Sequence, residues 1–411
     1  MSGDGSGGDR STRDAGGPSG RGGRVGRAGR AGSGDPTAPS GVPEARLHVV
    51  RFAPAKLNLT LAVTGRRDDG FHALRSVMVP LALGDVLNAS TSPVEGSRDS
   101  LRIVGLTLAP SPDNLVLQAF AAAREAVAAT WHGAPAHPPR LAARLVKHIP
   151  IAAGLGGGSS DAAAAIDVAL AAWGAHLEPQ ERLEIAADLG SDVPFFLAGG
   201  AALITGRGEF VEPLADITGD PVAVLLVTPH LPVSTADVFK AYSAGIRPSD
   251  TARAADVSER LGSAMRAGLS GGKLLAMAAE LATANDLLPA AESVAPALTG
   301  FREALERLLE RPVSQSGSGP TLWSLYANLA EARKAIRFVR LGMSNGALPR
   351  IGSGEPFVAA TTIEGRPMPP VVLPPDVSSG TIRPLGVHNW NETPDQAGQD
   401  SPGEPTRLKG D

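Results

Sequence analysis

The chain has 411 residues, of which 43% are hydrophobic, and its formal net charge at pH 7 is -4. It has no cysteine, which excludes disulfides, thiolate metal sites and thiol nucleophiles, and no apolar run reaches the roughly 18 residues that a membrane-spanning helix needs. The length favours two domains, and the near-neutral charge argues against a whole-chain nucleic-acid binder, so we expect a cytoplasmic protein with no membrane or nucleic-acid partner.

Both ends of the chain are predicted to be disordered. Residues 1–46 have almost no large apolar side chain and contain glycine–arginine runs such as 20–24, so burial cannot offset the entropy lost on ordering. That spacing also occurs in weak RNA-binding tails, although a solvated low-complexity extension fits the composition better. Residues 367–411 are rich in proline, glycine and aspartate without periodicity and are predicted to form a second tail.

The predicted elements between the tails follow in chain order. Leu57, Leu59, Leu61 and Val63 alternate with small or polar residues, which predicts a half-buried strand over 57–64 with Asn58 on its polar face. A turn at 66–70 follows, then short strands over 76–83, 86–89 and 101–104, a helix that begins near Asp113, a strand over 141–147 and a helix over 162–172. Strands that cluster before helices, without regular βαβ alternation, favour an α+β fold.

A glycine-rich loop precedes the last of these helices. Its glycines allow the backbone to approach a ligand closely, and the helix behind it offers unpaired N–H groups and a positive dipole end. We therefore predict a polyphosphate site here, against the alternative of an ordinary turn that caps a helix. The loop has no lysine, so it is not a Walker A motif, and it does not match the G-x-G-x-x-G fingerprint. The predicted site comprises Pro150, Ile151, Ala152, Ala153, Gly154, Leu155, Gly156, Gly157, Gly158, Ser159 and Ser160.

Three segments, in the same order along the chain, resemble the motifs of the GHMP kinase superfamily. They are Pro54–Leu59 (PAKLNL), the loop Pro150–Ser160 (PIAAGLGGGSS) and Ser316–Thr321 (SGSGPT). Within the superfamily, the match is closest to the 4-diphosphocytidyl-2-C-methyl-D-erythritol kinases, because the segments 53–59 (APAKLNL), 69–72 (DGFH) and 190–196 (GSDVPFF) are particular to them. The resemblance covers residues 47 to about 365.

This resemblance implies a fold and an activity. The fold is α+β, with an N-terminal ribosomal-S5-domain-2-like domain (47–218) that binds ATP and a C-terminal ferredoxin-like domain (219–366). The activity is transfer of the γ-phosphoryl group of ATP, with Mg²⁺, to the 2-hydroxyl of 4-diphosphocytidyl-2-C-methyl-D-erythritol in the non-mevalonate isoprenoid precursor pathway. The enzyme is expected to be a monomer or homodimer. Alternatives are a homoserine or mevalonate kinase, and a catalytically silent protein that binds nucleotide or RNA.

Two residues are predicted to carry the reaction. Asp192 lies between Gly190-Ser191 and an apolar stretch, where a partly desolvated carboxylate suits a general base; the alternative is a helix N-cap ahead of Pro194. The family's catalytic aspartate aligns with this position. Lys56 aligns with the catalytic lysine, which stabilises the aspartate anion and withdraws charge from the attacking oxygen; the alternative is an exposed lysine at a strand edge.

The resemblance also implies how the ligands are bound. Phe71 and His72 hold the cytosine ring by stacking and by its polar edge, and Phe239 completes an aromatic sandwich; phenylalanine at 71 replaces the family's more frequent tyrosine and keeps the stacking face. Asn58 orients the substrate hydroxyl. Asn114 and Lys147 match positions near the adenine and the phosphates. The metal ligands stay open, with Ser159 or Ser160 as the best candidates.

Overall fold

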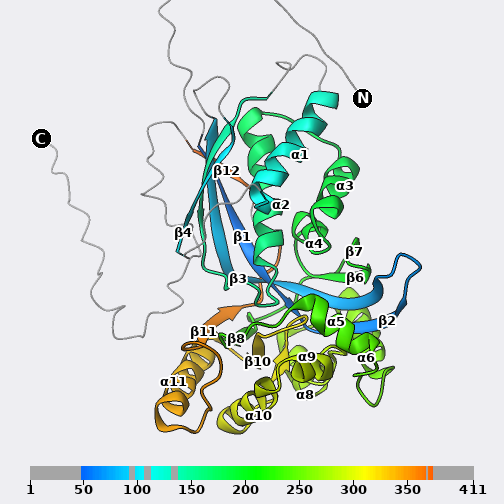
Figure 1. Ribbon diagram of the computed structural model, residues 1–411, viewed down its shortest axis with the longest axis vertical. Coiled ribbons are helices and arrows are strands. Elements are labelled where there is room, and N and C mark those ends of the chain that lie inside the picture. Colours follow the sequence, from blue (N-terminus) through cyan, green and yellow to red (C-terminus); the bar gives the residue numbers. More distant parts are fainter. Residues whose placement is uncertain (1–47, 92–97, 106–112, 131–137, 367–368, 374–411) are drawn as a thin grey trace, which may run out of the picture. The chain divides into compact units, whose positions relative to one another are not determined.

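The computed structural model describes residues 48–91, 98–105, 113–130, 138–366 and 369–373 (Figure 1). Over these residues the chain forms an eight-stranded sheet and a four-stranded sheet, with helices packed on both. The predicted N-terminal tail, residues 1–46, lies outside the described residues. None of the helices in the described part combines the length and the apolar character that a bilayer crossing requires.

The larger sheet is antiparallel except at one pair of strands. Its main path runs β12-β1-β3-β5-β4, with β2 and β6 also paired to β3 and β7 paired to β6, and β4 runs parallel to β5. The bounds are β1 His48–Asn58, β2 Ala62–Arg66, β3 His72–Thr91, β4 Ser100–Val104, β5 Leu141–Val146, β6 Ala202–Gly206, β7 Phe210–Pro213 and β12 Val371–Leu373. Because β12 pairs with the start of β1, the predicted C-terminal tail contains a strand, and the tail prediction is wrong for those three residues.

β3 is one strand of 20 residues where the sequence predicted separate short strands over 76–83 and 86–89. The predicted break falls at Gly84 and Asp85, a pair typical of turns. The strand continues through it because the Asp85 carboxylate accepts hydrogen bonds from the backbone N–H groups of His148 and Ile149. These bonds satisfy a side chain that would otherwise favour a turn.

The predicted half-buried strand over 57–64 is also wrong in its extent and its exposure. β1 ends at Asn58, β2 begins at Ala62, and both alternating sets of residues from 53 to 62 are buried. The strand is covered on both faces, since Ala53 packs into the core beneath the helices whereas Leu57 and Leu59 pack into a second core shared with the smaller sheet. Asn58 therefore lies inside the protein rather than on a solvated face.

Four helices cover one face of the larger sheet: α1 Leu115–Thr130, α2 Gly157–Trp173, α3 Pro179–Leu189 and α4 Val193–Ala198 (Figure 1). α2 packs against β1 and β3 and against α1. Its alanine-rich sequence makes this possible, because small side chains let a helix approach a sheet and a neighbouring helix closely. The first turn of α2 is thereby held against the strand that carries Lys56.

The smaller sheet has the strand order β11-β8-β10-β9 and is antiparallel. All of β8 is buried, because its alternate side chains enter the core shared with the larger sheet and a third core filled by α10 and α11. The bounds are β8 Ala223–Thr228, β9 Ser314–Gln315, β10 Leu322–Tyr326, β11 Phe357–Thr362, α5 Thr235–Ser243, α6 Arg253–Arg266, α7 Gly271–Ala276, α8 Ala278–Leu281, α9 Leu288–Val294, α10 Ala297–Leu309 and α11 Leu329–Asn345.

The mixed content of helices and mostly antiparallel strands agrees with the predicted class. The predicted boundary at residue 218 falls between β7 and β8, where the chain passes from the larger sheet to the smaller one. The described residues of both sheets belong to a single compact unit, so the division into a ribosomal-S5-like and a ferredoxin-like domain stays a prediction.

Candidate active site

The three motif segments, far apart in the sequence, are joined by hydrogen bonds. The backbone N–H of Lys56 donates to the carbonyl oxygen of Leu155 over 2.9 Å. The Ser316 hydroxyl donates to the carbonyl oxygen of Gly154 over 3.0 Å and lies 3.4 Å from the backbone nitrogen of Asn58. Asn285 supports the third segment, since its amide donates to the carbonyl oxygens of Gln315 and Gly317. The sequence resemblance therefore corresponds to one contiguous site.

The glycine-rich loop adopts conformations that other residues rarely take. Gly154 and Gly156 have φ values of +76° and +69°, and Gly156 is the N-cap of α2. A Cβ on Gly154 would lie 2.3 Å from the carbonyl oxygen of Ser316. The close contact between the two loops thus requires glycine at this position.

The predicted loop residues have different surroundings. Gly154, Gly156 and Ser159 line a cavity of about 740 Å³. Ala153, Leu155 and Ser160 are buried, and the Ser160 hydroxyl has no hydrogen-bond partner among the described residues. Like these three, Pro150, Ile151, Ala152, Gly157 and Gly158 do not line this cavity.

Lys56 and Asp192 meet at this cavity. The Lys56 side chain, on β1, is only 5% exposed, so the alternative of an exposed edge lysine is wrong. Its Nζ lies 3.7 Å from Oδ2 of Asp192, whose side chain is 31% exposed. Asp192 occupies the N-cap position of α4, but its side chain makes no capping hydrogen bond. The carboxylate is therefore directed to a lysine beside the loop, and no capping bond competes for it.

Asn58 is held in one orientation by a buried chain of hydrogen bonds. Its Oδ1 accepts from Lys56 Nζ over 2.5 Å, and its Nδ2 donates to the Ser76 hydroxyl over 2.8 Å. The Ser76 hydroxyl in turn donates to the carbonyl oxygen of Thr60 over 2.6 Å. The single hydroxyl proton of Ser76 is used in the bond to Thr60, so toward Asn58 the Ser76 oxygen can only accept. The Asn58 NH₂ group therefore faces Ser76, and its oxygen faces Lys56. Sequence reasoning missed Ser76, which lies in a strand with no motif character.

The predicted aromatic residues line the same cavity. Phe71 follows a turn and is 55% exposed. His72 stacks on Phe239 of α5, with ring centroids 5.2 Å apart and an interplanar angle of 24°. Two rings at that distance leave no room for a nucleobase between them. A base could enter between His72 and Phe239 only if the two rings moved apart. The ring that is exposed for stacking is that of Phe71.

Burial lowers the pKa of His72 from its usual value, and the positive charges of Arg66 and Arg247 add to the effect. The imidazole is accordingly neutral at pH 7, with one ring nitrogen protonated and the other free to accept. Its Nε2 lies 3.1 Å from the Ser243 hydroxyl. A neutral imidazole suits the polar edge of an uncharged base.

The structure does not bring Asn114 and Lys147 to the cavity wall. Asn114 accepts a hydrogen bond from the backbone N–H of Val116 at the start of α1. The Lys147 ammonium is buried and donates to Asp85 and, over 2.6 Å, to Asp161 in the first turn of α2. The role of both residues in ATP binding stays a prediction.

Two buried carboxylates share the single Lys147 ammonium. Burial raises the pKa of Asp161 to about 8, opposed by the charge of Lys147 and reinforced by that of Asp85. The pKa of Lys147 is raised because the two carboxylates outweigh its own burial. Through Lys147, the cluster links Asp85 of β3 to Asp161 near the start of α2. Asp161 directly follows the predicted loop, but no sequence signal pointed to Asp85.

A third buried acid, Asp286, gives a testable pH dependence. Its Oδ2 accepts from the backbone N–H of Val63, and burial raises its pKa from 3.8 to about 6. The folded state therefore holds this proton more tightly than the unfolded state, and stability falls as pH rises from 4 to 7. We expect the stability advantage of Asp286→Asn over wild type to grow by about 2 kcal/mol across that range. Urea unfolding at each pH measures it, and a difference that does not change with pH would contradict the assignment.

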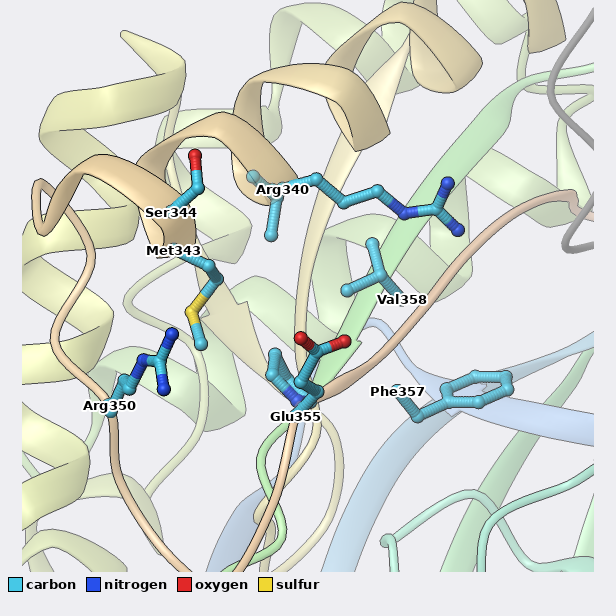
Figure 2. Close-up of a pocket in the computed structure, with 9 residues that line it drawn as sticks. Arg340, Met343, Ser344, Arg350, Glu355, Phe357 and Val358 are labelled. Carbon is cyan, nitrogen blue, oxygen red and sulfur yellow. The ribbon is translucent and has the colours of Figure 1, made fainter.

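A second cavity, of about 400 Å³, lies between α11 and the chain leading into β11 (Figure 2). In Figure 2 the guanidinium groups of Arg340 and Arg350 lie on opposite sides of the Glu355 carboxylate, so they do not converge on one point. None of the predicted site residues lines it. Within the described ranges, no group of three or more histidine or acidic side chains is placed to hold a metal ion.

Comparison with known proteins agrees with this geometry. Residues 114–200, from the start of α1 through Asp192, match the family model of the GHMP kinases N terminal domain. The 4-diphosphocytidyl-2-C-methyl-D-erythritol kinase of Pelotomaculum thermopropionicum is 38% identical over 293 residues, which cover 71% of this chain and 94% of that protein. The kinase of the same name from Paramagnetospirillum magneticum is 38% identical over 72% of this chain and 94% of its own length.

Solved structures give the same result. A crystal structure of 4-(cytidine 5'-diphospho)-2C-methyl-D-erythritol kinase superposes with a TM-score of 0.54 at 29% identity, and covers 77% of this chain and all of that one. A homoserine kinase from Cytophaga hutchinsonii superposes with a TM-score of 0.56 at 19% identity, over 80% of this chain and 98% of its own, which shows the shared fold. With relatives 38% identical over 94% of their length and the three motifs joined at one cavity, the chain belongs to the 4-diphosphocytidyl-2-C-methyl-D-erythritol kinase family of the GHMP kinases.

Proposed function

We propose that the protein transfers the γ-phosphoryl group of ATP to the 2-hydroxyl of 4-diphosphocytidyl-2-C-methyl-D-erythritol in the cytoplasm. The observation that carries this proposal is the Lys56–Asp192 pair beside the glycine-rich loop, in a cavity that also holds Phe71, His72 and Phe239. The Lys56–Asp192 pair suits phosphoryl transfer to an alcohol, and the three rings suit binding of a nucleobase on the acceptor. Homoserine and mevalonate have no nucleobase that could stack on these rings.

The residues take distinct roles in this proposal. Asp192 accepts the proton of the acceptor hydroxyl as the new O–P bond forms. Lys56, fixed by Asn58, keeps Asp192 ionised and stabilises negative charge on the attacking oxygen. The loop and the N-terminus of α2 bind the phosphates of ATP through backbone N–H groups. Catalysis is then mainly positioning and charge stabilisation, as is general for phosphoryl transfer.

Mg²⁺ accompanies ATP in reactions of this kind and neutralises charge on the β- and γ-phosphates. A bound Mg²⁺ would keep several waters and be held largely by the substrate phosphates, so it would take few protein ligands. Of the two predicted serines, Ser159 lines the cavity whereas Ser160 is buried. We infer that Ser159 is the protein ligand.

The proposed function is tested by supplying labelled ATP with a panel of acceptors. The panel contains 4-diphosphocytidyl-2-C-methyl-D-erythritol, other cytidyl-diphospho sugars, homoserine and mevalonate. We expect label only in the first. Label in homoserine or mevalonate would assign a different kinase activity, and ATP binding without any labelled acceptor would favour a silent nucleotide-binding protein.

The aromatic end of the cavity gives a second prediction. Phe71→Ala should raise the KM for the cytidyl substrate about tenfold, because stacking on an aromatic ring contributes about 1–3 kcal/mol per base. The KM for ATP should not change. Phe338→Ala is the matched control, since Phe338 on α11 is equally exposed, at 55%, and lines neither cavity. A rise in the KM for ATP instead would mean that the two substrates occupy the opposite ends of the cavity.

A further inference from the structure

Arg207 lies in the cavity wall between Phe71, at the aromatic end, and Asp192, at the catalytic end. It belongs to the turn between β6 and β7 and lines the cavity wall. Its guanidinium carbon lies 5.7 Å from the centroid of the Phe71 ring, within the range of a cation–π contact. The same turn contacts the catalytic end, because a Cβ on Gly208 would lie 2.7 Å from the carbonyl oxygen of Ser191, the neighbour of Asp192.

The acids near Arg207 are engaged by other groups. Glu209 accepts from the backbone N–H of Arg207 over 2.6 Å and lies 3.4 Å from the Arg67 guanidinium. Asp69 accepts from Arg67 over 3.0 Å and from the backbone N–H of Phe71 over 3.1 Å. Among the described residues, no carboxylate forms an ion pair with the Arg207 guanidinium, which is half-buried. Its five N–H donors are therefore free for a ligand.

The cavity as a whole favours an anionic ligand. Its lining includes three cations, Lys56, Arg207 and Lys240, and one acid, Asp192. Lys56 is paired with Asp192, so Arg207 and Lys240 leave an excess of positive charge on the wall. The chain itself is net negative, at -4, so this local excess does not reflect the overall charge. A cavity wall of one sign raises the local concentration of ligands of the opposite sign.

We propose that Arg207 is a specificity-determining residue that binds the diphosphate of the acceptor substrate. One face of its guanidinium packs over Phe71, and its N–H edge binds phosphate oxygens between the base on Phe71 and the hydroxyl at Asp192. Planar, bidentate binding of phosphate is the geometry for which arginine is suited. This inference rests on the proposed function, since it assigns a contact to the same substrate. It explains selection of a nucleoside diphosphate over a free nucleoside.

Arg207→Gln is the variant that tests the inference, with Arg207→Lys beside it. Cytidine and CDP are used as competitive inhibitors of phosphoryl transfer, and the KM for ATP is measured in the same assays. Arg311→Gln is the matched control, because Arg311 also lies over an aromatic ring, Tyr326 at 4.6 Å, but lines neither cavity. Comparison of cytidine with CDP separates the contact to phosphate from support of the Phe71 ring.

We expect Arg207→Gln to weaken inhibition by CDP about tenfold or more, because a charge-assisted hydrogen bond contributes about 1.5–3 kcal/mol. Inhibition by cytidine and the KM for ATP should change less than about twofold, because cytidine has no phosphate and the ATP phosphates are assigned to the glycine-rich loop. Arg207→Lys should fall between the two, since it keeps the charge and loses the fork.

Other results would overturn the inference. Equal weakening of cytidine and CDP would mean that Arg207 only supports Phe71, and a raised KM for ATP with unchanged CDP inhibition would place Arg207 at the ATP phosphates. In both cases the wild type would still phosphorylate the cytidyl substrate and the proposed function would stand. If the wild type is not inhibited by CDP and does not phosphorylate that substrate, the proposed function and the inference fail together.

Discussion

Replacing Asp192 with asparagine is expected to lower kcat by about a thousandfold, within the range for loss of a positioned general base. Asparagine keeps the size and a side-chain oxygen near Lys56 but cannot take the proton of the acceptor hydroxyl. The KM for ATP should stay nearly unchanged, because the loop that is proposed to bind the phosphates is held by Ser316 and α2 rather than by Asp192. Single-turnover measurements with saturating substrates separate the chemical step from binding.

The control for this variant is Asp188→Asn. Asp188 is an exposed acid on α3, only four residues before Asp192, so the variant makes the same chemical change without touching the cavity. It should have wild-type kcat. Near-normal turnover in Asp192→Asn would remove the general-base assignment and leave Lys56 and the loop as the catalytic groups.

Replacing Gly154 with alanine is expected to have the second largest effect. The new Cβ would lie 2.3 Å from the carbonyl oxygen of Ser316 and 3.1 Å from that of Gly319. Both are backbone atoms of the third motif, so they cannot rotate away as a flexible side chain would. The φ of +76° adds strain of about 1–2 kcal/mol for a residue with a side chain. The two loops must move apart, and a displacement of about 1 Å near a reacting group can lower the rate about a hundredfold.

Gly300→Ala is the control outside the site. Gly300 lies in α10, and its added Cβ would meet no heavy atom within 4 Å. Alanine should stabilise α10 by about 0.5–1 kcal/mol and leave the loop unchanged. Thermal unfolding and steady-state kinetics of the two variants are compared. If Gly154→Ala keeps wild-type kcat and KM for ATP, the contact between the two glycine-rich segments does not matter for the reaction.

The features that sequence reasoning predicted correctly depend on local chemistry. The loop from Pro150 to Ser160 is recognisable because close backbone approach needs glycine, and the helix after it needs a run of good helix formers. The order of the three motifs identified the family, and the pairing of Lys56 with Asp192 followed from the resemblance and has a counterpart in the 3.7 Å contact. The class of fold followed from the clustering of strands and helices.

Errors arose where the environment of a residue depends on distant parts of the chain. Alternating side chains around Leu57 predicted that Asn58 is solvated, but Asn58 is buried because Ser76 and the distant Ser316 lie against it, at 2.8 Å from its amide and 3.4 Å from its backbone nitrogen. Gly84 and Asp85 fell between two predicted strands, but the backbone N–H groups of His148 and Ile149, 63 and 64 residues later, donate to Asp85 within one continuous strand. Local preferences were overridden because burial and long-range hydrogen bonds contribute more free energy than a turn or strand propensity.

The chemical identity of the groups, namely the lysine, the acid, the glycine-rich loop and the aromatic rings, can be read from the order of the amino acids. Their partners are not. Lys147 carries the same charge in the sequence whether it faces a phosphate or two aspartates, and only folding brings Asp85 and Asp161 to it. Arg207 likewise has no motif around it, and its place over Phe71 follows from the pairing of β6 with β3. Charge and hydrogen bonding act over a few ångströms of space, and separation along the chain does not measure that distance.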